Sequence, residues 1–205
     1  MTQIVEGLKA DRCLLFVCDL QDKFQDRIHG FSNVLHVASI MIRAANVMGI
    51  PVVVTEQYPE RFGSTSSQIA SLLKPACKAI PKTTFSMVTA DVDAILAEHP
   101  SRTQILLTGI EAQVCVFQTA LDLLARDYEV HVLVDGVSSS RTLDRNVGIS
   151  RMAQHGAFMS CYEMALLQLM RDSKAPHFKA ISELLKETRP EPELPSPRPL
   201  LLPKL

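Results

Sequence analysis

The stretch TQILLTGIEAQVCVFQTALDLLARDYEVHVLVDG, residues 103–136, decides the fold class because it predicts a strand, a helix and a second strand in succession. Residues 103–109 and 129–136 are short apolar runs of the kind found in buried strands. Residues 112–127 between them have helical periodicity, with Cys115 one turn from the start. The apolar face of this helix contains Phe117, Ala120, Leu121 and Leu124.

The same alternation of strand and helix continues on both sides of this stretch, which predicts an α/β fold. We expect a three-layer α/β/α sandwich around a mostly parallel six-stranded sheet, because strands buried on both faces need helices above and below. The four other expected strands are residues 13–18, 51–56, 79–85 and 157–160. The other expected helices are residues 31–48, 66–74, 89–100, 142–155, 163–171 and 177–187.

Length and composition predict one globular domain over residues 8–187, followed by a Pro-rich tail over residues 188–205. Six of the eighteen tail residues are proline, so we expect a surface-laid or mobile extension there. The formal net charge of −1 predicts no nucleic-acid partner and no acidic membrane partner. The apolar runs have the length of strands, so we expect no membrane span.

The five cysteines contain no C-x-x-C pair, and the first residues lack the features of a secretory signal. We therefore expect free thiols in a reducing compartment and a cytoplasmic location. The six histidines show no spacing typical of metal ligands, and we expect no cofactor.

Three residues capable of complementary chemistry lie at or near predicted strand ends. Asp19 closes the first strand, Lys82 lies in the third, and Cys115 follows the fourth. The carboxyl ends of parallel strands meet at one edge of a sheet, so these side chains can be neighbours. A cysteine thiolate is a strong nucleophile, and a carboxylate within reach can take its proton.

Each of these residues also has a plain structural interpretation. A cysteine on a helix after a strand is usually part of the core, and an aspartate ending a strand often caps a turn. A lysine after a proline is usually solvated. Alternation along the strand predicts that Cys18 points to the face opposite Asp19.

The motifs LLFVCDLQDKF, IPKTTFS and LLTGIEAQVCVFQTALDLLARDYEVHVLVDGVSS together resemble the isochorismatase-like cysteine hydrolase superfamily. The resemblance runs from about Cys13 to about Met170, and it implies a Rossmann-like fold. It also implies self-association into a homo-oligomer.

The resemblance implies roles for individual residues. The family's D-x-Q-x-x-F motif falls on Asp19, Gln21 and Phe24, which makes Asp19 the general acid and base and Phe24 a pocket residue. Lys82 and the nucleophile Cys115 would complete a catalytic triad. A cis peptide would join Ile110 to Glu111 and direct the Glu111 N–H toward an oxyanion. Gln21, Phe24, Gln57 and Tyr58 are the expected substrate-pocket residues.

The resemblance favours a metal-independent hydrolase that cleaves the amide-type C–N bond of a small-molecule substrate through a Cys115 thioester. Metal-dependent nicotinamidases of this superfamily carry an Asp/His cluster after the second strand, whereas this chain has TEQYPERFG there, without histidine. The comparison with the family therefore implies no catalytic metal. A catalytically idle binding or scaffold protein is the alternative. The Pro-rich tail motivates this alternative because such segments form ligands for other domains.

Overall fold

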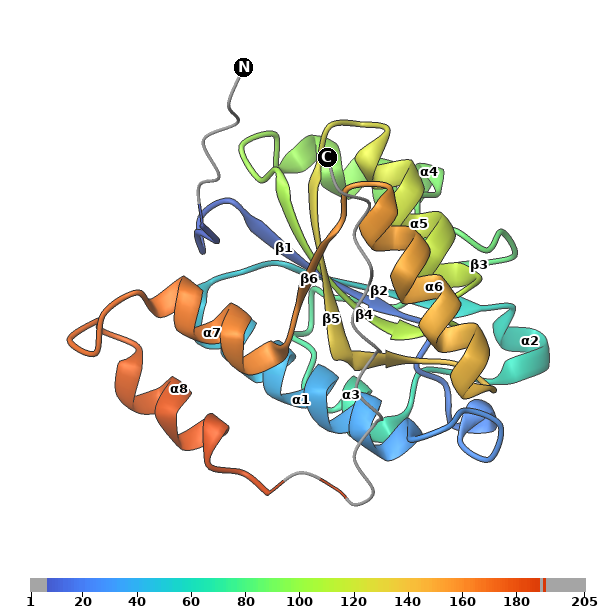
Figure 1. Ribbon diagram of the computed structural model, residues 1–205, viewed down its shortest axis with the longest axis horizontal. Helices are drawn as coiled ribbons and strands as arrows, with labels where there is room; N and C mark the ends of the chain where they lie inside the picture. Colours follow the sequence, from blue (N-terminus) through green and yellow to red (C-terminus); the bar gives the residue numbers. More distant parts are fainter. Residues whose placement is uncertain (1–6, 189, 191–205) are drawn as a thin grey trace.

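The computed structural model describes residues 7–188 and 190, and this part of the chain folds around a six-stranded parallel sheet (Figure 1). The strand order is β3-β2-β1-β4-β5-β6, as expected for a doubly wound α/β fold. The strands are β1 (Cys13–Cys18), β2 (Val52–Gln57), β3 (Ile80–Lys82), β4 (Gln104–Ile110), β5 (Glu129–Ser138) and β6 (Phe158–Ser160).

Helices cover both faces of the sheet and complete the predicted three-layer sandwich. One face is covered by α1 (Phe31–Met48), α3 (Ser67–Ala70), α7 (Tyr162–Met170) and α8 (Phe178–Leu185). The opposite face is covered by α4 (Ala90–Glu98), α5 (Cys115–Leu124) and α6 (Thr142–Gln154). In the part of the chain that is described, no helix is both long and apolar enough to span a bilayer.

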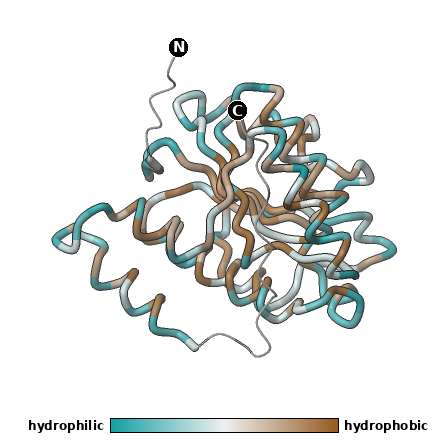
Figure 2. The backbone as a smooth tube through the Cα atoms, viewed as in Figure 1, coloured by the Kyte–Doolittle hydropathy of each residue, from teal (hydrophilic) through white to brown (hydrophobic). Residues whose placement is uncertain are grey.

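The hydrophobic core consists of two layers separated by the sheet. All residues of β1 and β4 are buried, and alternate residues of β1 enter opposite layers. Leu15 and Val17 pack under α1, whereas Phe16 and Cys18 pack under α5. Figure 2 shows the hydrophobic residues gathered in the central strands and the hydrophilic ones along the outer loops. This alternation is what allows a parallel sheet to support two layers of helices.

Three predicted elements differ from the structure by three residues or more at one or both ends. The helix expected over residues 112–127 begins only at Cys115, because residues 112–114 form a turn in which the Glu111 carbonyl accepts from the Val114 and Val116 N–H groups. The strand expected over residues 79–85 is shortened to β3, and the helix expected over residues 66–74 is reduced to α3.

The segment expected to be a loop after β2 contains a short helix, α2 (Pro59–Phe62), and the segment after β1 contains a 3₁₀ turn, η1 (Asp22–Phe24). Phe24 and Phe62 contact each other with ring centroids 4.9 Å apart. This pair joins the two segments beside the carboxyl end of the sheet. Short helices of this kind leave little periodic signal in the sequence.

Candidate active site

Asp19 and Lys82 form an ion pair buried at the carboxyl end of the sheet. The Lys82 Nζ lies 2.7 Å from the Asp19 Oδ2, and both side chains are almost fully buried. Thr55 donates a hydrogen bond to the other carboxylate oxygen, at 2.7 Å. Asp19 has a left-handed backbone, with φ at 56°. Few residues other than glycine adopt this conformation, so the surrounding structure must hold Asp19 there.

The Lys82 ammonium donates to three acceptors in addition to the Asp19 carboxylate. Its Nζ donates to the Gln57 Oε1 at 2.6 Å and to the carbonyl oxygens of Thr84 and Phe85 at 3.1 and 3.0 Å. Together with the Asp19 carboxylate, these groups fix the ammonium in one position. Burial alone would lower the pKa of Lys82, but Cys18, Asp19 and Cys115 together raise it above its usual value. Lys82 therefore carries a positive charge at neutral pH.

Cys115 is the first residue of α5 and lines a cavity next to Asp19. As the first helical residue, it has an N–H group with no partner inside the helix, and the helix N-terminus favours negative charge there. Its carbonyl accepts a hydrogen bond from the Thr119 hydroxyl at 2.7 Å. The Cys115 side chain is therefore presented to the cavity from the positive end of a helix dipole.

The turn between β4 and α5 has an unusual backbone. The Ile110–Glu111 peptide bond is cis. Gly109 has a φ of 129°, and a Cβ added to it would lie 2.2 Å from the Cys18 carbonyl oxygen. The Glu111 carboxylate accepts from the Ser140 N–H and from the Gln113 side chain, at 3.0 and 3.1 Å. The turn is thus held closely against the end of β1.

Cys18 also belongs to the site, contrary to the expectation from alternation. It lies in the same hydrophobic layer as Cys115, and its thiol donates to the Asp19 Oδ2 at 3.5 Å. The left-handed backbone at Asp19 ends the regular strand, so alternation does not extend from Cys18 to Asp19. Burial raises the pKa of the Cys18 thiol well above its usual value, and the side-chain hydrogen bond with Cys115 raises it further.

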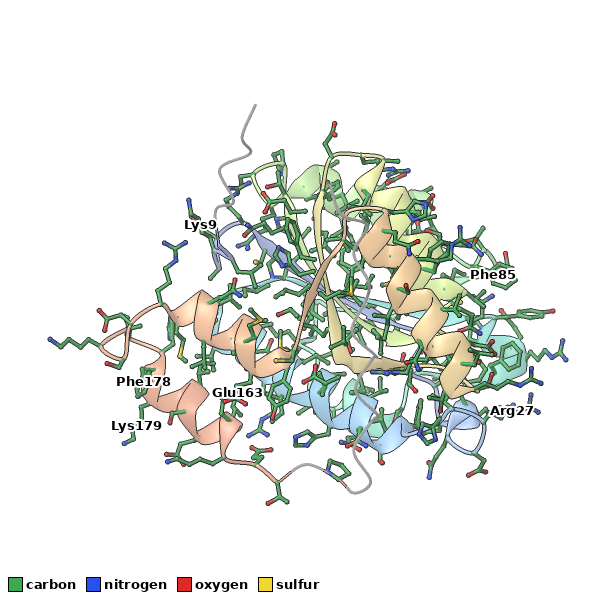
Figure 3. The ribbon with its side chains drawn as sticks, viewed as in Figure 1. Lys9, Arg27, Phe85, Glu163, Phe178 and Lys179 are labelled. Carbon is green, nitrogen blue, oxygen red and sulfur yellow. The ribbon has the colours of Figure 1, made fainter. Side chains whose placement is uncertain are left out.

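The cavity beside Cys115 has a volume of about 250 Å³ and mostly apolar walls. Phe24 and Gln57 line it, as the sequence predicted, together with Asp19, Ile110 and Glu111. Sequence reasoning missed four lining residues, namely Phe62, Phe85, Gln113 and Val114. Figure 3 shows Phe85 at the outer edge of the molecule, on the side of β3 and α2, where its side chain is 52% exposed.

The other two expected pocket residues, Gln21 and Tyr58, are not among those that line this cavity. Gln21 is fully buried and connects neighbouring backbone segments. Its amide nitrogen donates to the Gln57 and Gly63 carbonyls, and its oxygen accepts from the Gln57 N–H. Tyr58 precedes α2 and is 45% exposed. Gln21 therefore supports the pocket wall that contains Gln57.

No group of three or more His, Cys, Asp or Glu side chains within residues 7–188 and 190 is arranged to hold a metal ion. The ionisable side chains at the site are those of Asp19, Lys82, Cys18, Cys115 and Glu111. This set can supply a nucleophile, a base and a fixed positive charge. The carboxylates at the site that could bind a hard metal ion are those of Asp19 and Glu111. Asp19 already accepts from Lys82 and Thr55, and Glu111 already accepts from the Ser140 N–H.

Comparisons with known proteins place the chain among relatives of one family and one fold. The model of the isochorismatase domain matches residues 13–164. Isochorismatase domain-containing protein 2 of Homo sapiens is 42% identical over 178 residues, which cover 87% of this chain and 85% of that protein. Isochorismatase domain-containing protein 1 of Salmo salar is 41% identical, but the match spans only 62% of its length.

The solved structure of MAR1 ribonuclease from Caenorhabditis elegans has the same fold, with a TM-score of 0.86. It is 36% identical in sequence and matches 98% of this chain and 100% of its own. Because the match covers nearly the whole of both chains, it includes the strand ends that carry the candidate site.

Proposed function

The chain belongs to the isochorismatase family, and from that membership we propose that it is a cysteine hydrolase that cleaves the C–N bond of a small amide. The observation that carries the proposal is that Cys115 lines one apolar cavity together with Asp19, whose carboxylate is paired with the buried Lys82. A nucleophile, a proton acceptor and a fixed cation are what acyl transfer through a thioester requires. No step of this reaction uses a metal.

The reaction begins with proton transfer from the Cys115 thiol to the Asp19 carboxylate. Lys82 keeps that carboxylate in position and offsets negative charge as the thiolate forms. The thiolate sulfur attacks the amide carbon, and the carbonyl π electrons move to oxygen. The N–H groups of Glu111 and Cys115 stabilise the resulting oxyanion, since backbone donors at a helix start are suited to this role.

The tetrahedral intermediate collapses when Asp19 returns its proton to the leaving nitrogen. The C–N bond breaks, the amine departs, and the acyl group remains on Cys115 as a thioester. Water, deprotonated by Asp19, then attacks the thioester and releases the carboxylic acid and the thiol. The net reaction consumes one amide and one water, and it returns the enzyme to its starting state.

The walls of the cavity favour a small and uncharged acyl group. A volume of about 250 Å³ accommodates a compact molecule, and Phe24, Phe62 and Phe85 offer aromatic surfaces to it. The charged lining residues, Asp19 and Glu111, are both acidic. Lys82 compensates the charge of Asp19, so Glu111 is the carboxylate that disfavours an anionic substrate such as isochorismate at this cavity.

A screen of small amides and ureas, with nicotinamide included, tests the proposed reaction. We expect Cys115→Ala to lose turnover at least about 1,000-fold, because removing the nucleophile of a covalent mechanism leaves only binding and oxyanion stabilisation. Intact-mass spectrometry under substrate excess should show the acyl adduct on the wild-type chain only. The matched control is Cys161→Ala, at a half-buried cysteine before α7. Full turnover by Cys115→Ala would refute the mechanism.

Two alternative functions, a catalytically idle binding protein and a ribonuclease, can each be distinguished from the proposed hydrolase by one measurement. A catalytically idle binding protein predicts that iodoacetamide labels Cys115 as slowly as the other cysteines at pH 6, whereas an activated nucleophile labels much faster. The Pro-rich tail that motivates this alternative lies outside the described residues, apart from Thr188 and Pro190.

The name of the Caenorhabditis elegans relative raises ribonuclease activity as a further alternative. The lining of the cavity argues against a phosphodiester substrate, because it contains no basic side chain and the Glu111 carboxylate would repel phosphate. Incubation of the chain with a mixed-sequence RNA, with Cys115→Ala as control, tests this directly. Cys115-dependent cleavage of RNA would replace amide hydrolysis as the proposed activity.

A further inference from the structure

A second cysteine lies inside the proposed catalytic cluster and has no role in the hydrolysis. Cys18 ends β1, is fully buried and shares a hydrophobic layer with Cys115. Its thiol donates, at 3.5 Å, to the same Asp19 oxygen that accepts from Lys82, and Asp19 lines the same cavity as Cys115. The Cys115 thiol is close enough to raise the pKa of Cys18. The proposed nucleophile thus has a second thiol as its immediate neighbour.

We propose that Cys18 and Cys115 are a covalent modification site, at which a hydroperoxide converts the two thiols into a reversible disulfide. The proposal rests on the reactivity of Cys115 that the proposed function requires. Its consequence is that oxidation inactivates the hydrolase without destroying the nucleophile. A disulfide also prevents the further oxidation of Cys115 to the sulfinic acid, which cells rarely reverse.

The first step takes place in the cavity, which gives a small peroxide access to Cys115. The Cys115 thiolate attacks the terminal peroxide oxygen, the O–O bond breaks, and the peroxide leaves as water or an alcohol after protonation. The sulfur is oxidised by two electrons to a sulfenic acid, and the peroxide is reduced by two.

The second step uses the Asp19 carboxylate that already accepts the Cys18 thiol. Asp19 takes the Cys18 proton as that sulfur attacks the Cys115 sulfur. The S–O bond of the sulfenic acid breaks, and the departing hydroxide takes the proton from Asp19 and leaves as water. The product is one disulfide, and a dithiol reductant returns two electrons and two protons to restore both thiols.

The other cysteines lack this arrangement. Cys13 begins β1 and packs in the opposite hydrophobic layer, roughly 16 Å from Cys18 along the strand. Burial raises its pKa to about 12. The Cys77 thiol donates to the Val52 carbonyl at 3.1 Å, and Cys161 precedes α7 on the other side of the sheet. Cys13→Ser is therefore a matched control for Cys18→Ser.

The test is treatment of the reduced full-length chain with one equivalent of hydrogen peroxide, followed by alkylation, trypsin digestion and mass spectrometry. We expect a disulfide between the peptide that contains Cys18 (CLLFVCDLQDK) and the peptide that contains Cys115 (TQILLTGIEAQVCVFQTALDLLAR). Because the first peptide also contains Cys13, the Cys13→Ser chain should keep the link and the Cys18→Ser chain should lose it. Dithiothreitol should restore Cys115 alkylation in wild type.

In Cys18→Ser and Cys18→Ala, one equivalent should stop at the sulfenic acid, and an excess of hydrogen peroxide (two equivalents or more) should convert Cys115 to the sulfinic acid, which dithiothreitol does not reverse. A wild-type chain that yields sulfinic acid at Cys115 without the linked peptide overturns the proposal, as does a Cys115 that resists peroxide. The Cys13→Ser chain by itself assigns the link to Cys18, so a folding defect in Cys18→Ser leaves the test intact. Fast iodoacetamide labelling of the reduced chain without a disulfide after peroxide would overturn this inference alone and leave the proposed hydrolase standing.

Discussion

Asp19 and Lys82 neutralise each other's charge in the protein interior. Removing one of them should therefore lower the free energy of unfolding more than removing both. Lys82→Met leaves the Asp19 carboxylate buried without a counter-charge. We expect it to lower the free energy of unfolding by about 3–5 kcal/mol. Adding Asp19→Asn should recover part of this loss, because the second change removes the uncompensated charge. Urea denaturation of the wild type, both single variants and the double variant measures the coupling.

The control for this cycle is the surface pair of Asp93 and Arg126, whose side chains are both 44% exposed. Asp93→Asn should change the free energy of unfolding by less than about 1 kcal/mol, because water screens exposed charges. If Lys82→Met were no more harmful than Asp93→Asn, then the buried pair would have little part in holding the site.

His131 makes the stability of the protein depend on pH. It is 8% exposed, stacks on Phe158 with ring centroids 4.9 Å apart, and burial lowers its pKa from the usual 6.5. Below pH 6.5 the unfolded chain therefore binds a proton that the folded chain does not. The free energy of unfolding should fall as the pH decreases through that window and be fully restored above it.

Urea denaturation between pH 5 and pH 8 should show a weaker pH dependence for His131→Leu than for the wild type. The Nε2 atom of His131 has no hydrogen-bond partner in the described structure, so leucine leaves no group unsatisfied there. His155→Leu is the control, because that side chain is exposed. Equal pH dependence in the His131→Leu chain and the wild type would contradict the prediction.

At the scale of elements, β1 and β4 approach closely at Gly109, and this approach positions the start of α5, where Cys115 lies. Gly109→Ala would place a Cβ 2.2 Å from the Cys18 carbonyl oxygen, at a φ of 129°. We expect a loss of more than about 4 kcal/mol in the free energy of unfolding, since backbone cannot move aside as a side chain can. Thermal and urea denaturation, with the iodoacetamide labelling rate of Cys115, measure the effect.

Gly156→Ala separates this clash from backbone strain. Gly156 also has a positive φ, 99°, but an added Cβ would meet nothing within 4 Å. Gly156→Ala should lower the free energy of unfolding by about 1–2 kcal/mol and leave the iodoacetamide labelling of Cys115 unchanged. Similar losses for the two glycines would show that strain, rather than the approach of the two strands, governs Gly109.

At the scale of the whole molecule, we predict that residues 8–187 fold without the tail. Ile181 and Leu184 of α8 are buried against the layer that contains α1, so the packed part of the chain extends to that helix. A chain ending at residue 187 should match the full chain in its melting temperature and in Cys115 labelling. Light scattering on both chains also tests the predicted homo-oligomer. A large loss of stability on truncation would assign the tail a structural role.

The sequence by itself determined the succession of strands and helices along the chain, the α/β/α layering and the candidate catalytic residues Asp19, Lys82 and Cys115. Each of these depends on local periodicity or on which residues close a strand, and both are visible in one segment. Tertiary structure alone decided the rest. Asp19 contacts Cys18 because the left-handed backbone of Asp19 interrupts alternation, and Phe62 reaches the cavity because α2 packs on η1. Such contacts join segments far apart in the chain, and no local pattern encodes them.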